Sequence, residues 1–142
     1  MTSELRDRLL ALAAFADAFA RPGFTFGAWA DPAPDEDGTI QMPWFDYNAD
    51  ADAFRAAAAG NGWVRPFDWM AWAASNEGRR LIDDPRLVAD ASVDDLTKLL
   101  TACIRGDRFV EGNLAGALES GMLLAIVRRA AVLAETIREE RR

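Results

Sequence analysis

The stretch Ser92-Val-Asp-Asp-Leu-Thr-Lys-Leu-Leu-Thr-Ala-Cys-Ile-Arg105 sets the architecture of this 142-residue chain. Its apolar residues recur every three or four positions, as they do on one face of an α-helix. Ser92 with Asp95 three residues later is typical of a capping box, and Gly106 is a helix-ending residue. The pattern therefore predicts an amphipathic helix that buries one face against neighbouring elements.

Two further helices are predicted after this one, over residues 108–119 and 120–139, because their apolar positions have the same spacing. The three helices are expected to share one core. Its predicted members are Leu96, Leu100, Cys103, Ile104, Leu114, Leu118, Leu123, Ile126 and Val127.

The N-terminal half predicts a mixture of helix and strand. A helix is expected over residues 4–20, and Asp50 is expected to cap a short alanine-rich helix that ends at Gly60. Between them, residues 24–29 alternate as in a strand and are expected to pair with residues 39–42 across a loop rich in Pro and Asp.

A short helix that starts at Pro66 or Phe67 carries Trp69 and Trp72, which lie three apart and so share a face. Aromatic residues at this spacing fit either a core or the wall of a groove. The whole pattern predicts a mainly helical α+β fold. We expect a single domain over residues 1–142, with a C-terminal three-helix core and a small N-terminal β-hairpin.

Charge is distributed unevenly along the chain. The formal net charge is −7, and residues 31–52 contain seven acidic side chains and no basic one. This distribution disfavours nonspecific nucleic-acid binding, which depends on basic side chains that neutralise phosphates. It favours a protein partner with a basic surface, although a solvated acidic loop that keeps the protein soluble has the same composition.

The chain shows neither a secretory signal pattern nor an apolar run long enough to span a membrane, so a cytoplasmic location is expected. Cys103 is the single cysteine and cannot form an internal disulfide, in keeping with a reducing compartment.

The chain lacks the residues or motifs that several common kinds of catalysis and ligand binding require. The chain has no histidine, Cys103 lies on an apolar helix face, and the glycines fit no phosphate-binding loop. Asp46-Tyr-Asn-Ala-Asp50 resembles the start of a calcium loop, but Ala51 and Ala57 replace its required glycine and glutamate. We therefore expect no catalytic residue, no metal site and no cofactor.

A string of charged residues runs through apolar and glycine positions between residues 105 and 119. In a helix over residues 108–119, Gly112 and Gly116 would share one face, and Arg108 could pair with Glu111. The charges would then form either a network that fixes how three helices meet, or the floor of a pocket walled by tryptophans. The candidate site residues are Trp69, Trp72, Arg105, Asp107, Arg108, Glu111 and Glu119.

Three motifs together resemble a family of short bacterial proteins catalogued only as a domain of unknown function. These motifs are Asp68-Trp69-x-x-Trp72, Arg105-x-Asp107-Arg108-Phe109-x-Glu111-Gly112 and Glu119-Ser120-Gly121. The resemblance is strongest over residues 63–129, and it implies no activity, cofactor or partner.

We expect a protein-binding module without catalytic activity. One alternative is a small enzyme or small-ligand binder, in which Glu111 and Glu119 act as acid and base beside Arg105 and Arg108. Another alternative is an acidic inhibitor from a mobile element that imitates nucleic acid. The sequence leaves the oligomeric state open.

Overall fold

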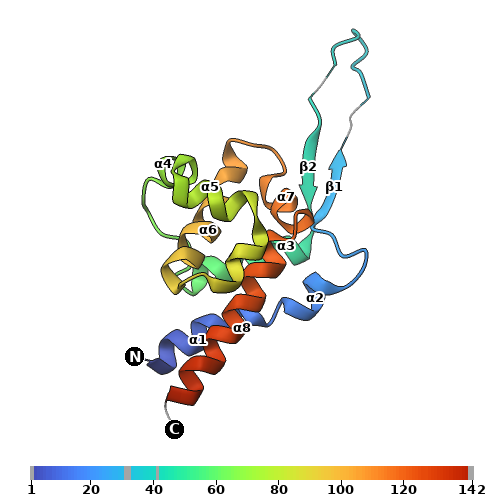
Figure 1. Ribbon diagram of the computed structural model, residues 1–142. Coiled ribbons are helices and arrows are strands. Elements are labelled where there is room, and N and C mark those ends of the chain that lie inside the picture. Colours follow the sequence, from blue (N-terminus) through green and yellow to red (C-terminus); the bar gives the residue numbers. More distant parts are fainter. Residues whose placement is uncertain (1, 31–32, 41, 141–142) are drawn as a thin grey trace.

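A computed structural model describes residues 2–30, 33–40 and 42–140 of the chain (Figure 1). The elements in chain order are α1 (Thr2–Ala13), α2 (Ala16–Ala20), β1 (Gly27–Ala30), β2 (Trp44–Tyr47), α3 (Ala49–Gly60), α4 (Trp69–Ala74), α5 (Asn76–Asp83), the 3-10 helix η1 (Pro85–Asp90), α6 (Val93–Arg105), the 3-10 helix η2 (Gly106–Arg108), α7 (Asn113–Glu119) and α8 (Met122–Glu140). The predicted mainly helical α+β fold with a small hairpin is confirmed.

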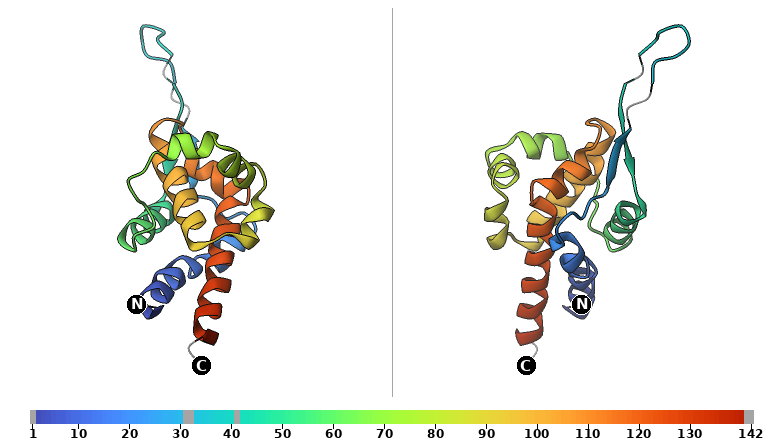
Figure 2. Two further views of the ribbon diagram at one scale, coloured as in Figure 1. Left: turned by 60° about the vertical axis from the view of Figure 1, so that its left-hand side comes forward. Right: turned by 90° about the vertical axis from the view of Figure 1, so that its right-hand side faces the viewer.

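Helix α8 is the central helix of the fold and packs against helices from both halves of the chain. Helix α1 packs along its C-terminal half, so that both ends of the chain lie at the same end of the molecule (Figures 1 and 2). Helices α6 and α7 pack on its N-terminal half. The predicted core is largely confirmed. Its fully buried members are Leu96, Leu100, Leu114, Leu123, Ile126 and Val127, and its half-buried members are Cys103, Ile104 and Leu118.

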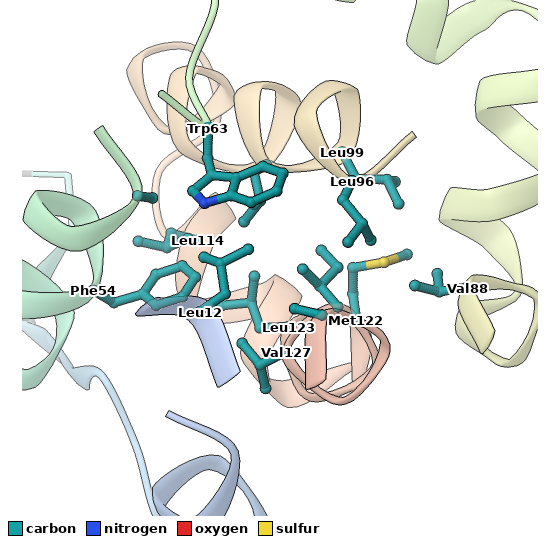
Figure 3. Packing of buried hydrophobic residues seen from close by; sticks show 14 of the residues in the cluster. Leu12, Phe54, Trp63, Val88, Leu96, Leu99, Leu114, Met122, Leu123 and Val127 are labelled. Carbon is teal, nitrogen blue, oxygen red and sulfur yellow. The ribbon is translucent and has the colours of Figure 1, made fainter. Parts of the chain in front are cut away.

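The N-terminal half adds large side chains to the same core, as Figure 3 shows for Leu12, Phe54 and Trp63. Trp63 is fully buried. Its indole N–H donates to the Arg8 carbonyl at 3.0 Å, so burial leaves no unsatisfied donor there. The Arg8 guanidinium lies over the ring, 4.6 Å from its centroid.

Two predicted helix boundaries are wrong. The helix expected over residues 4–20 is interrupted after Ala13. The rings of Phe15 and Phe19 both lie 5.2 Å from that of Phe54, an aromatic cluster that accompanies the break. The alanine-rich helix is capped by Asn48 and not by Asp50, because the Asn48 side chain accepts the Ala51 N–H.

The hairpin forms one segment further along than predicted. The partner of Gly27–Ala30 is Trp44–Tyr47 and not residues 39–42, with Trp29 opposite Phe45. The alternation of Trp44–Tyr47 explains this register, since Phe45 is buried and Tyr47 half-buried while Trp44 and Asp46 are exposed. The predicted loop and partner strand include Asp31, Pro32 and Gln41, which lie outside the described residues.

Within residues 2–30, 33–40 and 42–140, no helix combines the length and the apolar character that a membrane crossing requires.

Candidate functional site

The charged string does not form the expected helix over residues 108–119. Helix α6 runs into η2, and α7 begins only at Asn113. Gly112 precedes α7 with a φ of 77°, in the left-handed region that breaks a continuous helix. Arg108 and Glu111 therefore lie in a 3-10 turn and a loop, and they do not pair along a helix as expected.

Asp107 is the centre of the polar contacts in this region. One carboxylate oxygen, Oδ1, accepts the Tyr47 hydroxyl at 2.6 Å. The other, Oδ2, accepts the Arg55 guanidinium at 2.7 Å. The Arg55 guanidinium also lies over the Tyr47 ring, 4.1 Å from its centroid. A single carboxylate thus joins η2 to β2 and α3.

The same group also satisfies the start of α7. Gly112 occupies the N-cap position and has no side chain to accept the first helical N–H groups. Asp107 Oδ1 accepts the Leu114 N–H at 3.4 Å, and the Tyr47 hydroxyl accepts the Ala115 N–H at 3.3 Å. Capping of α7 and attachment of β2 therefore depend on the same two side chains.

Burial raises the pKa of Tyr47 to about 12, and the hydrogen bond that its hydroxyl donates to Asp107 acts in the same direction. Tyr47 therefore lies half-buried at the base of the hairpin, and its protonated hydroxyl donates to the Asp107 carboxylate. The sequence patterns did not identify Tyr47 or Arg55 as partners of Asp107. The only sequence signal for this contact is that the single tyrosine stands at the end of an alternating segment.

Glu111 is the second tie between the loop and the hairpin. Its Oε1 accepts the Phe45 N–H at 2.6 Å. The Trp29 ring packs directly on Gly112, where the Cβ atom of any other residue would lie 2.9 Å from Trp29 Cζ2. Gly112 is therefore required by a positive φ and also by the close approach of Trp29.

A cavity of about 460 Å³ opens between α4, α5, α6 and α7. Two of the predicted site residues, Trp69 and Glu111, line it. Most other lining residues are apolar, and Cys103 is among them. Burial raises the pKa of the Cys103 thiol to about 12, so this thiol is protonated and weakly nucleophilic at neutral pH.

The remaining predicted residues lie outside the cavity lining. Trp72 is a core residue, and its indole N–H has no acceptor. Arg105 is half-buried at the end of α6, with its Nε also unpaired. Arg108 and Glu119 are exposed. The seven residues thus divide among a core position, a polar tie, a cavity and open surface.

The acidic start of the calcium-loop pattern is spread over two elements. Asp46 is exposed on β2, the Asn48 side chain caps α3, and Asp50 lies in the first turn of that helix. In the part of the chain that the structure describes, no group of three His, Cys, Asp or Glu side chains is placed to hold a metal ion.

Comparison with known proteins places the chain without assigning an activity. The model of a Family of unknown function (DUF6508) matches residues 4–136. No curated protein and no solved structure matches the chain. The predicted resemblance to a family of unknown function is confirmed.

Proposed function

The chain belongs to the Family of unknown function (DUF6508), a description that names no activity, and we propose that the chain is a protein-binding module. Its contact surface is the arm, defined as the β-hairpin and connecting loop over residues 27–47. The observation that carries the proposal is the projection of the described part of this arm beyond the helical body (Figures 1 and 2).

Among the described residues of the arm, several large apolar side chains are exposed. Ile40 and Met42 in the loop are 82% and 85% exposed, and Trp44 on β2 is 46% exposed. Trp44 and Asp46 lie on the outer face of β2, opposite the face that carries Phe45 and Tyr47. Exposed aromatic residues of this kind are typical anchors of protein–protein contacts.

The charge of the arm favours a basic partner. Residues 27–47 contain five acidic side chains and no basic one. Three of the acids, Asp35, Glu36 and Asp37, gather at the tip turn, where the Gly38 N–H donates to the Asp35 carbonyl. Hydrogen bonds from Thr39 hold the pKa of Asp37 below its usual range, so that its carboxylate is charged. An acidic, aromatic surface complements a partner that is basic and partly apolar.

Asp107 and Glu111 hold β2 through the Tyr47 hydroxyl and the Phe45 N–H, while Trp44 and Asp46 on the outer face of β2 stay exposed. A binding surface that is fixed before association loses less conformational freedom on binding. In the alternative of an acidic inhibitor that imitates nucleic acid, the protein would use the same surface, because such an inhibitor also acts by binding a basic protein.

The enzyme alternative has no comparable support. It requires Glu111 and Glu119 as an acid–base pair, but Glu119 does not line the cavity that Glu111 borders.

A random peptide library selected on the purified full-length protein tests the proposed function. We expect the enriched peptides to combine Lys or Arg with aromatic or aliphatic residues and to lose affinity for the Trp44→Ser variant. The Val132→Ser variant is the matched control, because Val132 is a similarly exposed apolar residue on α8. Enrichment of acidic or uncharged peptides, or equal binding to Trp44→Ser and wild type, would contradict the proposal.

A further inference from the structure

We infer that the cavity between α4, α5, α6 and α7 is a binding site for a small organic cation with an apolar body and one ammonium group. This inference is independent of the arm, because no described residue of the arm lines the cavity. The two are linked by Glu111, which lines the cavity and accepts the Phe45 N–H of β2. It rests on the size of the cavity, the chemistry of its walls and the one charge on its lining.

The walls fit an apolar body. Leu99, Ala102 and Met122 line the cavity and are themselves core residues that are 1%, 8% and 3% exposed, so the cavity reaches the hydrophobic core. A volume of about 460 Å³ lies within the range of pockets that hold small organic molecules. A sugar or another strongly hydrated molecule would lose its water hydrogen bonds here without replacing them.

Gly116 keeps part of this space open. It lies in the middle of α7 and lines the cavity, and a Cβ atom there would meet no other atom within 4 Å. Packing therefore does not require glycine at this position, although glycine lowers the stability of a helix. A larger side chain at Gly116 would occupy the cavity.

Glu111 supplies the charge. It is the one acidic or basic side chain among the described residues that line the cavity. The Phe45 N–H holds one oxygen of its carboxylate at 2.6 Å, so the group is fixed before a ligand arrives. A positive ligand gains from this carboxylate, whereas a fatty acid or another anion would be repelled.

One aromatic ring lines the cavity, and a second ring packs against it. Trp69 lines the cavity, and its ring centroid is 6.0 Å from that of Phe109, which is 66% exposed. The faces of such rings attract ammonium groups through their negative π-systems. Carboxylate and aromatic faces together select a cation over a neutral molecule of the same shape.

Three probes that share one apolar body separate these contributions: 4-phenylbutylammonium, 4-phenylbutanol and 5-phenylpentanoate. Titration calorimetry on the full-length protein should rank their affinities in that order, with the ammonium binding at or below about 1 mM. The Glu111→Gln variant should weaken ammonium binding about five-fold and leave alcohol binding unchanged. Glu119→Gln removes the same charge outside the cavity and should change neither affinity.

Occupation of the cavity is tested by two further measurements. Gly116→Leu should abolish binding of the ammonium and the alcohol, with folding checked by thermal unfolding. Cys103 lines the cavity and is the only thiol, so saturating 4-phenylbutylammonium should slow its alkylation. The inference is overturned by any of three results: no saturable ammonium binding, equal affinities for all three probes, or ammonium binding that persists in Gly116→Leu.

Discussion

Asp107 is the residue on which attachment of the arm depends most. Its two carboxylate oxygens accept from Tyr47, Arg55 and the Leu114 N–H, in three different elements. The carboxylate side chain is only 18% exposed, so each of these bonds is shielded from competing water. Hydrogen bonds that involve an ionised group are stronger than neutral ones.

Tyr47 provides a direct optical test of this environment, because it is the single tyrosine. Tyrosinate absorbance should titrate with a midpoint near 12 in the folded protein, against the value of 10.0 for an unperturbed tyrosine. Asp107→Asn should lower the midpoint but not restore it fully, because burial is the larger cause. A wild-type midpoint near 10 would contradict the described contacts.

The same shift determines a pH dependence of stability. Between pH 10 and 12 folded Tyr47 keeps the proton that an unfolded chain has already lost. Its contribution to folding stability is therefore fully present below about pH 10 and is lost as the pH rises through about 12. Tyr47→Phe should show less of this alkaline loss in thermal unfolding.

Gly112 and Gly116 form a matched pair with opposite expected effects. Gly112→Ala should cost about 1–3 kcal/mol of unfolding free energy, because an alanine at positive φ is strained and its Cβ meets Trp29. Gly116→Ala should add about 0.5–1 kcal/mol, because this site is helical and open. Urea unfolding measures both, and similar effects of the two substitutions would show that one glycine environment is misassigned.

At the scale of elements, η2 and the loop that follows it connect the arm to the body. The Asp107 carboxylate attaches β2 to α3 and α7, and Glu111 binds the outer edge of β2 through the Phe45 N–H. Neighbouring charged residues in this segment therefore differ sharply in their structural roles.

Asp107→Ala and Arg108→Ala should show this difference. Asp107→Ala leaves Tyr47 without its acceptor and Arg55 with only its longer ion pair to Asp52, and it should cost about 1–3 kcal/mol in urea unfolding. Arg108 is exposed, and its replacement should change stability by less than about 0.5 kcal/mol. The reverse order would mean that Arg108 and not Asp107 holds the elements together.

The elements that could be predicted are those with strong local signals. The capping box of Ser92 and Asp95 is present as expected, since it depends on residues three apart. The contacts of Asp107 could not be predicted, because Tyr47 and Arg55 lie 60 and 52 residues away along the chain. The break in the helix at Gly112 could not be predicted, because Gly112 has a positive φ and contacts the ring of Trp29. Trp29 is distant in sequence, so the local helical pattern does not reveal this contact.

At the scale of the whole molecule, a helical body and a projecting arm have different surfaces. The acids of residues 31–52 equal the whole net charge of −7, so the remaining acidic and basic residues balance. The body carries the core and the cavity, and the arm carries the concentrated negative charge with exposed Trp44. This division is the basis for proposing that the arm binds a protein partner.

The most direct test of that assignment compares two variants with equal loss of charge. Glu36→Gln/Asp46→Asn neutralises two acids of the arm, and Asp83→Asn/Glu135→Gln neutralises two exposed acids on α5 and α8. Calorimetry with the basic peptide selected on the wild type should show affinity reduced about three- to ten-fold for the arm variant and unchanged for the control. Equal affinity of the two variants for that peptide would contradict the assignment of binding to the arm.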